Sequence, residues 1–264
     1  HHCSLMKFFL SEYRHDYSSY TFGYTIYAIC ESRSDLEFIY SNGFLPYTGN
    51  LEIRADIFYK SRGIRIVLDH FSDTSENRRV QRKIASFNIK ESVIPIESFD
   101  QWDEFFDFAK KYSNVRIGDH KMPLERIKYI CSRKYLTHII QFNQDDKVIG
   151  YILVVISDSF MHFWFSFYDT TFLEQNIPLG KWLMWKCIHI AKAMDKSYIY
   201  LGNGYQKSSL YKTRDFKGVE YYNGNSWSSD LEKFQLLVSQ DEALRPLDDF
   251  KLNGDWNQQI ESLL

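Results

Sequence analysis

Asp169 and Tyr168 end an aromatic run, FMHFWFSFYD, that is predicted to form a strand, and a turn follows them directly. A carboxylate there could orient an attacking amine or accept its proton, and the tyrosine could line the pocket for a transferred group. Each residue also has an ordinary interpretation, because aspartate is common in turns and tyrosine at the rim of a core. We take both as candidate catalytic residues.

The stretch IPLGKW that follows leads into a predicted helix and offers a candidate anion site. Backbone N–H groups at a helix N-terminus can hold a phosphate, and Lys181 could add positive charge. Coenzyme A-dependent acyltransferases of the GNAT type carry Q/R-x-x-G-x-G/A at such a turn, whereas here Gly180 is alone and Pro178 has no N–H to donate. Gly180 therefore indicates an altered donor site, or a turn that needs a small residue for close packing.

Two basic clusters could bind phosphates or an acidic group of a substrate. Arg78 and Arg79 open the first, and the second contains Lys207, Lys212, Arg214 and Lys217. Tyr205 precedes the second cluster and could line a pocket or stack on a nucleotide base. A solvated charged surface is the simpler interpretation of either cluster.

Other chemistries are disfavoured by composition. The 264 residues have a formal net charge of −2, so the chain as a whole creates no broad attraction for nucleic acid. The four cysteines form no CxxC pair and the histidines lack partners at ligand spacing, so we expect no metal site and no bound cofactor. The longest apolar runs are shorter than the ~20 residues that span a bilayer. We expect a cytoplasmic protein that does not bind a membrane.

The elements that must position these residues fall into two predicted units. Residues 1–87 are predicted to form a small β-rich domain with one short helix, and FSDTSENRRVQRK (71–83) is predicted to be a polar connection. From residue 88 to 264 the order is helix, helix, three strands, helix, strand, helix, strand. We therefore predict an α+β class with a GNAT-like acyltransferase fold, in which helices flank a mixed central sheet.

Several short motifs in the second unit resemble the C-terminal domain of the arginyl-tRNA–protein transferase family and its bacterial leucyl-transferring relatives. Members carry S-F-Y-D-P, S-L-G opening a helix, Y-x-L-G-Y, and Y-K-x-x-F-x-P-x-E followed by tryptophan. The matching residues are Ser166 to Asp169, Leu179, Gly180, Tyr200 to Gly202, Tyr211, Lys212, Phe216, Glu220 and Trp227. Upstream, Arg78 and Arg79 occupy paired basic positions, and the resemblance extends over roughly residues 55 to 230.

Three departures from the family pattern limit what the resemblance implies. Phe58 and Ser61 stand near the place of a family CxxC motif, so metal, cluster and haem binding are not expected. The loop after Gly202 is about two residues shorter than in the family, and Lys217 replaces a proline. We interpret the chain as a divergent member.

The resemblance implies transfer of an arginyl or leucyl type amino acid from tRNA to an α-amine, often at an acidic protein N-terminus. Aminoacyl-tRNA would be a co-substrate, and an acceptor protein or peptide N-terminus the partner. An activated ester needs a deprotonated amine, proximity and oxyanion stabilisation, but no nucleophilic serine or cysteine. Two alternatives stay open: an acyltransferase using acetyl-CoA or another acyl-CoA, and a non-catalytic module that binds tRNA ends or protein N-termini.

Overall fold

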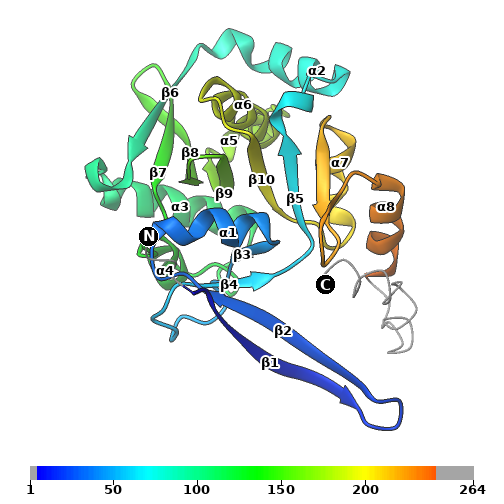
Figure 1. Cartoon of the computed structure of the whole chain (residues 1–264). Coiled ribbons are helices and arrows are strands. Elements are labelled where there is room, and N and C mark those ends of the chain that lie inside the picture. The colour runs from blue at the N-terminus through cyan, green and yellow to red at the C-terminus, as the bar shows by residue number, and fades with distance from the viewer. Residues whose placement is uncertain (1–4, 242–264) are drawn as a thin grey trace.

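Two β-sheets form the framework of the molecule, for which the computed structural model describes residues 5–241 (Figure 1). The larger sheet has eight strands. In spatial order they are β12 (Trp227–Ser228), β11 (Val219–Tyr222), β5 (Gly63–Val67), β10 (Tyr198–Asn203), β9 (Phe160–Tyr168), β8 (Lys147–Ile156), β7 (His138–Gln144) and β6 (Ile89–Pro95). The smaller sheet has four, in the order β1 (Lys7–Asp16), β2 (Thr21–Ile29), β4 (Ile57–Lys60) and β3 (Phe44–Pro46).

Helices cover both faces of the larger sheet. Alternate residues of β8 divide between the two faces: Ile152 and Val154 share a core with α2 and α6, whereas Tyr151 and Leu153 share one with α3 and α4. The helices are α1 (Leu36–Ser41), α2 (Ser75–Ile84), α3 (Trp102–Arg116), α4 (Leu124–Cys131), α5 (Thr171–Glu174), α6 (Leu179–Ala193), α7 (Tyr211–Arg214) and α8 (Leu231–Gln240). A third core, which includes Tyr40 and Phe58, joins the small sheet and α1 to the larger sheet.

The larger sheet is mixed because β9 and β10 run parallel, whereas its other pairs are antiparallel. A parallel pair needs a crossover connection, and α6 provides it. Leu183, Cys187 and Ile188 on this helix are fully buried against the sheet. The predicted α+β class and GNAT-like order of elements are confirmed.

The segment predicted to be a polar connection is instead the amphipathic helix α2. Thr74 and Asn77 form a reciprocal capping box at its N-terminus, and Val80 and Ile84 are buried four residues apart. The prediction was wrong because the buried face of α2 has only two apolar residues, and charged residues dominate the rest of the segment. Such a segment shows no clear helical pattern of apolar residues. Packing against α6 stabilises the helical conformation of α2, and this contact cannot be recognised from the local sequence.

β5 falls within the predicted first unit (residues 1–87) but belongs to the larger sheet. β5 lies between β10 and β11 in the larger sheet, and α2 packs on that sheet's crossover helix. The smaller sheet is complete at Lys60. Several further elements were not anticipated, among them β1, β3, β6 and α8. The last of these lies in the tail from Ser228, whose residues beyond 241 are outside the described part.

Replacing Ile84 with alanine should test the helical packing of α2. Its side chain is 2% exposed, so we expect Ile84→Ala to lower the free energy of unfolding by about 2–5 kcal/mol. Exposed Arg82 on the same helix is the control, and Arg82→Ala should change it by less than about 0.5 kcal/mol. Urea denaturation followed by circular dichroism measures both, and equal small effects would contradict a packed helix.

Candidate active site

The site is built where β9 and β10 stop pairing. Their parallel ladder has three pairs, from Tyr198↔Phe160 to Tyr200↔His162. Beyond it β10 carries a register irregularity against β5 and Gly202 adopts φ +82°, a conformation that favours glycine. Two cavities open beside this divergence, and Phe163, Met184 and Tyr211 line both of them. The two cavities therefore adjoin through a shared wall.

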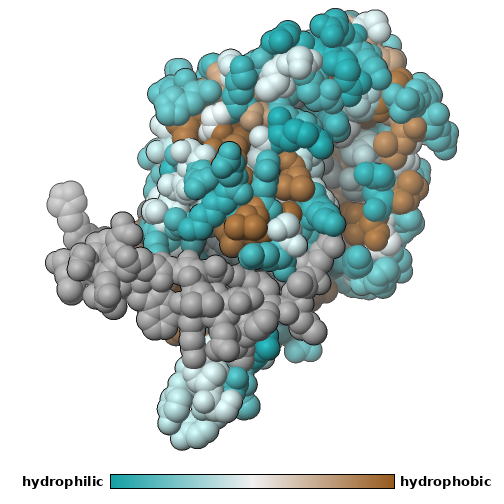
Figure 2. Space-filling model, turned by 90° about the vertical axis from the view of Figure 1, so that its right-hand side faces the viewer, coloured by the Kyte–Doolittle hydropathy of each residue, from teal (hydrophilic) through white to brown (hydrophobic). Residues whose placement is uncertain are grey.

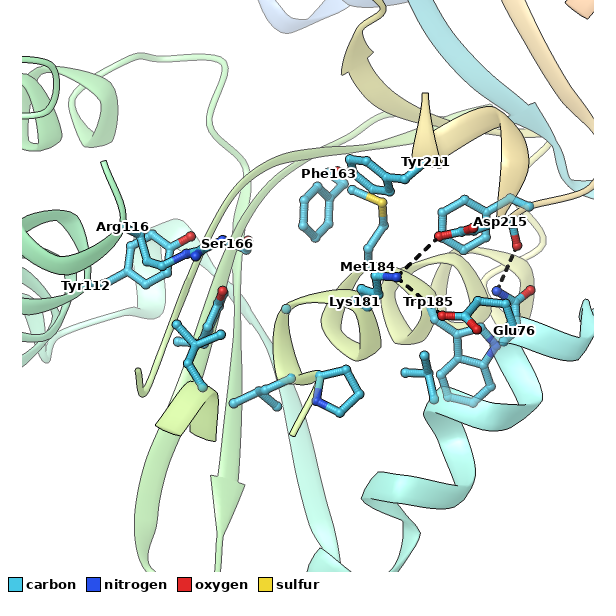
Figure 3. A pocket seen from close by; sticks show the side chains of 18 residues that line it. Glu76, Tyr112, Arg116, Phe163, Ser166, Lys181, Met184, Trp185, Tyr211 and Asp215 are labelled. Carbon is cyan, nitrogen blue, oxygen red and sulfur yellow. Dashed lines mark hydrogen bonds and ion pairs between the residues drawn. The ribbon is translucent and has the colours of Figure 1, made fainter. Parts of the chain in front are cut away.

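The first cavity, here called the α6 pocket, has a volume of about 420 Å³ and lies at the N-terminus of α6 (Figure 3). Met184, Trp185 and Phe216 contribute an apolar lining. Its polar lining residues come from α2, α3, β9, α6 and the end of α7: Glu76, Asn77, Tyr112, Arg116, Ser166, Tyr168, Lys181, Tyr211 and Asp215.

A compact charge cluster closes one side of the α6 pocket. Lys181 Nζ lies 3.3 Å from Glu76 Oε1 and 3.7 Å from Asp215 Oδ2, contacts drawn in Figure 3. Glu76 also accepts two 2.7 Å hydrogen bonds from Arg79, and these lower the pKa of Glu76 to about 2. Glu76 therefore stays ionised at neutral pH, and Lys181 is already engaged by two carboxylates.

Gly180 is needed for the close approach of Tyr168. A β-carbon at position 180 would lie 2.9 Å from Cε1 of the Tyr168 ring, closer than such atoms come. That ring in turn packs edge-on against Tyr112, with centroids 4.8 Å apart. Gly180 thus permits the packing of the pocket wall, and Tyr168 is part of that wall.

Arg116 stands across the α6 pocket from the charge cluster. It is exposed and makes no ion pair with any carboxylate among residues 5–241. Its neighbour Tyr112 is largely buried, and burial raises the pKa of Tyr112 to about 12, although Arg116 opposes the shift. The guanidinium is hydrogen-bonded to Tyr112 but meets no carboxylate among residues 5–241, so it can also bind an anionic ligand.

The second cavity, here called the splay pocket, has a volume of about 590 Å³. It lies between the larger sheet and the smaller one. Its lining comes from β2, from the segment after β3, and from the diverging ends of β9 and β10, with Arg126 and Lys212 from α4 and α7. Arg126 and Lys212 bring positive charge, and within residues 5–241 no aspartate or glutamate lines this cavity. This composition suits a ligand that carries a carboxylate.

Lys212 is a half-buried cation of the splay pocket. Its Nζ donates a 3.0 Å hydrogen bond to the Asn203 carbonyl oxygen, at the end of β10. Burial lowers the pKa of Lys212 to about 8, because the charged form loses hydration. A lysine with such a pKa can exchange a proton near neutral pH.

Arg126 is the second cation of this pocket. Nη1 donates to the Lys121 carbonyl and Nη2 to Thr48 Oγ1 at 3.3 Å, but the buried Nε has no partner. Burial lowers the pKa of Arg126 from its ordinary value, and it makes no ion pair within the described part of the chain. An unmatched guanidinium with an unsatisfied donor is poised for an anion.

His162 contributes a neutral ring to the same pocket. Its Nδ1 lies 2.7 Å from the hydroxyl of buried Tyr40. Burial and, to a smaller extent, the charge of Lys212 together lower the pKa of His162 to about 3. The imidazole is therefore uncharged at neutral pH.

Several residues predicted from the sequence lie outside the lining of both cavities. Asp169 accepts hydrogen bonds from the backbone N–H and hydroxyl of Thr171 and pairs with Lys147 at 3.0 Å, as an aspartate in a turn does. Tyr205 accepts a hydrogen bond from the Arg62 backbone. Two more lie nearby without lining the cavities: Arg78, which donates to the Asp73 carbonyl, and Lys207, in a 3-10 turn before α7.

Sequence reasoning missed several charged or titratable lining residues, among them Glu76, Arg116, Arg126 and His162. Glu76 sits in the segment that was not predicted to be helical, and Arg126 lies on a helix predicted only for its packing. Nothing in their local sequence reveals that distant elements bring them together. Arg79, by contrast, borders the α6 pocket through its bond to Glu76.

Two residues of the family-like motif have a structural role. Arg65 on β5 donates to Glu220 at 2.9 Å, and its guanidinium lies between the rings of Tyr198 and Trp227, at 3.9 and 4.1 Å. This clamp ties β11 and β12 to the centre of the sheet. The chain runs from α7 directly into β11, so fixing β11 through Glu220 and Trp227 also restricts the position of α7.

Within residues 5–241, no cluster of histidine, cysteine or acidic side chains could hold a metal ion. Over the same residues, no helix combines the length and the apolar character needed to cross a bilayer.

Comparison with known proteins identifies a family for part of the chain. Residues 104–221 match the family model described as "Arginine-tRNA-protein transferase, C terminus". An aspartate/glutamate leucyltransferase of Chromohalobacter salexigens is 22% identical over 179 residues, which are 64% of this chain and 68% of that protein. The family resemblance expected from the motifs is confirmed.

Solved structures with a similar arrangement are more distant in sequence. L-PGS from Bacillus licheniformis is 12% identical with a TM-score of 0.43, over 80% of this chain and 71% of that one. FemX is 10% identical with a TM-score of 0.45, over 80% of this chain and 72% of that one.

His162 should make the fold sensitive to acid. In the unfolded chain its pKa is near 6.5, whereas the folded value is about 3, so below pH 6.5 the unfolded state binds a proton that the folded state excludes. Stability should fall as pH drops from 6.5 toward 3, by up to about 1.4 kcal/mol per pH unit. Urea midpoints of the wild type and His162→Gln at pH 7 and 5 isolate this contribution; identical pH dependence would refute it.

Proposed function

Residues 104–221 belong to the arginine-tRNA-protein transferase C-terminal family, and we propose that this chain moves an aminoacyl group from tRNA to the α-amine of a protein or peptide. The observation that carries the proposal is the pair of adjoining cavities. A transfer between two large substrates needs both reacting ends to meet while their bodies stay apart. Two cavities with a shared wall provide such a meeting point.

We assign the aminoacyl end of tRNA to the α6 pocket. Apolar Met184, Trp185 and Phe216 suit the terminal adenosine or the amino acid side chain, and Arg116 suits a phosphate. Beside the pocket, α2 carries basic side chains at its exposed surface, among them Arg78, Arg82 and Lys83. These cations would meet the tRNA backbone.

We assign the acceptor N-terminus to the splay pocket. Arg126 would bind a carboxylate there, which fits an acceptor that begins with aspartate or glutamate. Lys212 would then receive the proton that the attacking ammonium must lose. An α-amino group has a pKa of about 7.7–8.0, close to the value of about 8 for Lys212, so this proton transfer is nearly balanced.

In the proposed reaction the neutral amine attacks the ester carbonyl carbon, a peptide bond forms, and the ester bond to the tRNA ribose breaks. The proton taken up by Lys212 passes to the departing ribose oxygen. Backbone N–H groups of β9 beyond His162, where the ladder to β10 has ended, are candidates for stabilising the oxyanion. No covalent enzyme intermediate is required.

Transfer from acyl-CoA is the second candidate, and features of the donor turn weigh against it. The turn contributes one glycine, Pro178 precedes α6 without an N–H, and Lys181 is held by Glu76 and Asp215. A pyrophosphate would have to compete with these carboxylates.

A donor competition assay tests the proposed function. The protein is mixed with radiolabelled aminoacyl-tRNA or labelled acetyl-CoA and with peptides that begin with Asp, Glu, Ala or Lys. We expect label to pass from tRNA to the peptides that begin with Asp or Glu. Only these peptides bring a side-chain carboxylate at the first residue that can pair with Arg126. Labelling from acetyl-CoA alone would overturn the proposal, and no labelling from either donor would favour a binding module.

Lys212 should be more important for turnover than its motif neighbours. Lys212→Met keeps the volume but removes the base, so we expect kcat to fall by about 10²-fold or more. Wild-type kcat should rise with pH through about 8, because only the neutral lysine accepts a proton, and the variant should lose this rise. Single-turnover rates between pH 6 and 9 measure both effects.

Asp169→Asn is the matched comparison, since Asp169 was the base expected from the sequence. Circular dichroism and urea midpoints would verify that both variants fold. Lost turnover in Asp169→Asn together with normal turnover in Lys212→Met would transfer the role of base to Asp169.

A further inference from the structure

Strands β1 and β2 form a hairpin that projects from the body of the molecule (Figure 1). Only Tyr27, Ala28 and Ile29 of β2 continue the sheet by pairing with β4. The rest is a two-stranded ribbon whose large side chains are exposed, including Leu10 at 60%, Tyr13 at 65% and Tyr17 at 73%. An isolated two-stranded ribbon is only marginally stable in water. Exposed apolar side chains gathered on such a ribbon indicate an interaction surface.

One face of the hairpin is continuous with the splay pocket. Thr25 and Tyr27 line that pocket, and opposite them in the register stand Ser11 and Phe9, which share their face. Phe9 stacks on Tyr27 with ring centroids 4.8 Å apart. Farther out, Tyr13 lies over Gly23, where a β-carbon would come within 2.7 Å of its ring. An aromatic track therefore leads away from the pocket.

The charge of the hairpin argues for a polypeptide rather than a nucleic acid on this track. Lys7 and Arg14 are balanced by Glu12 and Asp16. In Figure 2 the projecting tip is pale to teal, as tyrosine and serine would colour it, with no brown patch. The basic helix α2 lies at the opposite end of the molecule in Figure 1. Binding of tRNA would use the basic end.

We propose that the pocket-side face of the hairpin, formed by Phe9, Ser11, Tyr13, Thr25 and Tyr27, binds the acceptor polypeptide beyond its N-terminal residue. The inference rests on the proposed function and extends it, because it makes the enzyme recognise an unfolded N-terminal segment. From Tyr27 to Gly23 the strand spans four residue steps, so about four extended acceptor residues would lie along it. Tyrosine rings bind an extended chain at low cost in side-chain entropy.

Acceptor length provides the test. Two peptides begin with the same residue, a tripeptide and a twelve-residue peptide, and transfer from aminoacyl-tRNA is measured for both. In the wild type we expect the longer peptide to have a KM about ten-fold lower. Tyr13→Ser should raise the KM of the longer peptide about five-fold and leave kcat, the tripeptide KM and the tRNA KM unchanged. Leu10→Ser, on the other face of the ribbon, is the matched control and should change none of these.

Each other outcome decides against the inference. Equal KM values for the two peptides in the wild type would overturn docking on the hairpin while leaving the transferase reaction intact. A higher KM for aminoacyl-tRNA in Tyr13→Ser would assign the surface to nucleic acid. If the wild type transfers to neither peptide, the proposed function has failed. Binding to the hairpin is then tested by fluorescence anisotropy of the labelled twelve-residue peptide. Equal affinity of this peptide for the wild type and for Tyr13→Ser would overturn the docking surface.

Discussion

The short parallel pairing of β9 with β10 is the constraint on which the site depends. Three pairs hold the strands together, and both then continue in different directions. The space left between them cannot be closed by backbone hydrogen bonds, so side chains from other elements fill it: Phe163 from β9, Met184 from α6 and Tyr211 from α7. The same divergence ends β10 at Asn203, whose carbonyl oxygen holds Lys212.

The two cavities differ in how their charges are balanced. In the α6 pocket, Lys181 is compensated by Glu76 and Asp215, so the protein itself satisfies most of that charge. In the splay pocket, the partners of Lys212 and Arg126 within the described part of the chain are carbonyl and hydroxyl oxygens. Burying a cation without a counterion is unfavourable, and a lowered pKa is the expected response. A ligand carboxylate would relieve this cost, which favours acidic ligands over neutral ones.

Sequence reasoning predicted most of the elements from residue 98 onward, because their apolar residues recur at helical or strand spacing and their turns are marked. It failed for α2, whose buried stripe has two apolar residues among charges. For the site it identified Tyr168, Gly180, Lys181 and Lys212, which now line the cavities, since each stands at a strand end or helix start. Arg126 and His162 could not be found this way, because the pocket exists only through contacts between segments far apart in the chain.

The walls of the cavities come from two parts of the chain, one that matches the family model and one that precedes it. Lys212, Tyr168 and Arg126 lie within the segment that matches the family model. Glu76, Tyr27 and Tyr47 lie before it, on α2, on β2 and after β3, yet they line the same cavities. Substitutions among residues 25–80 can therefore reshape the cavity walls without changing the segment that matches the family model. Proteins that share the matched segment need not share substrates.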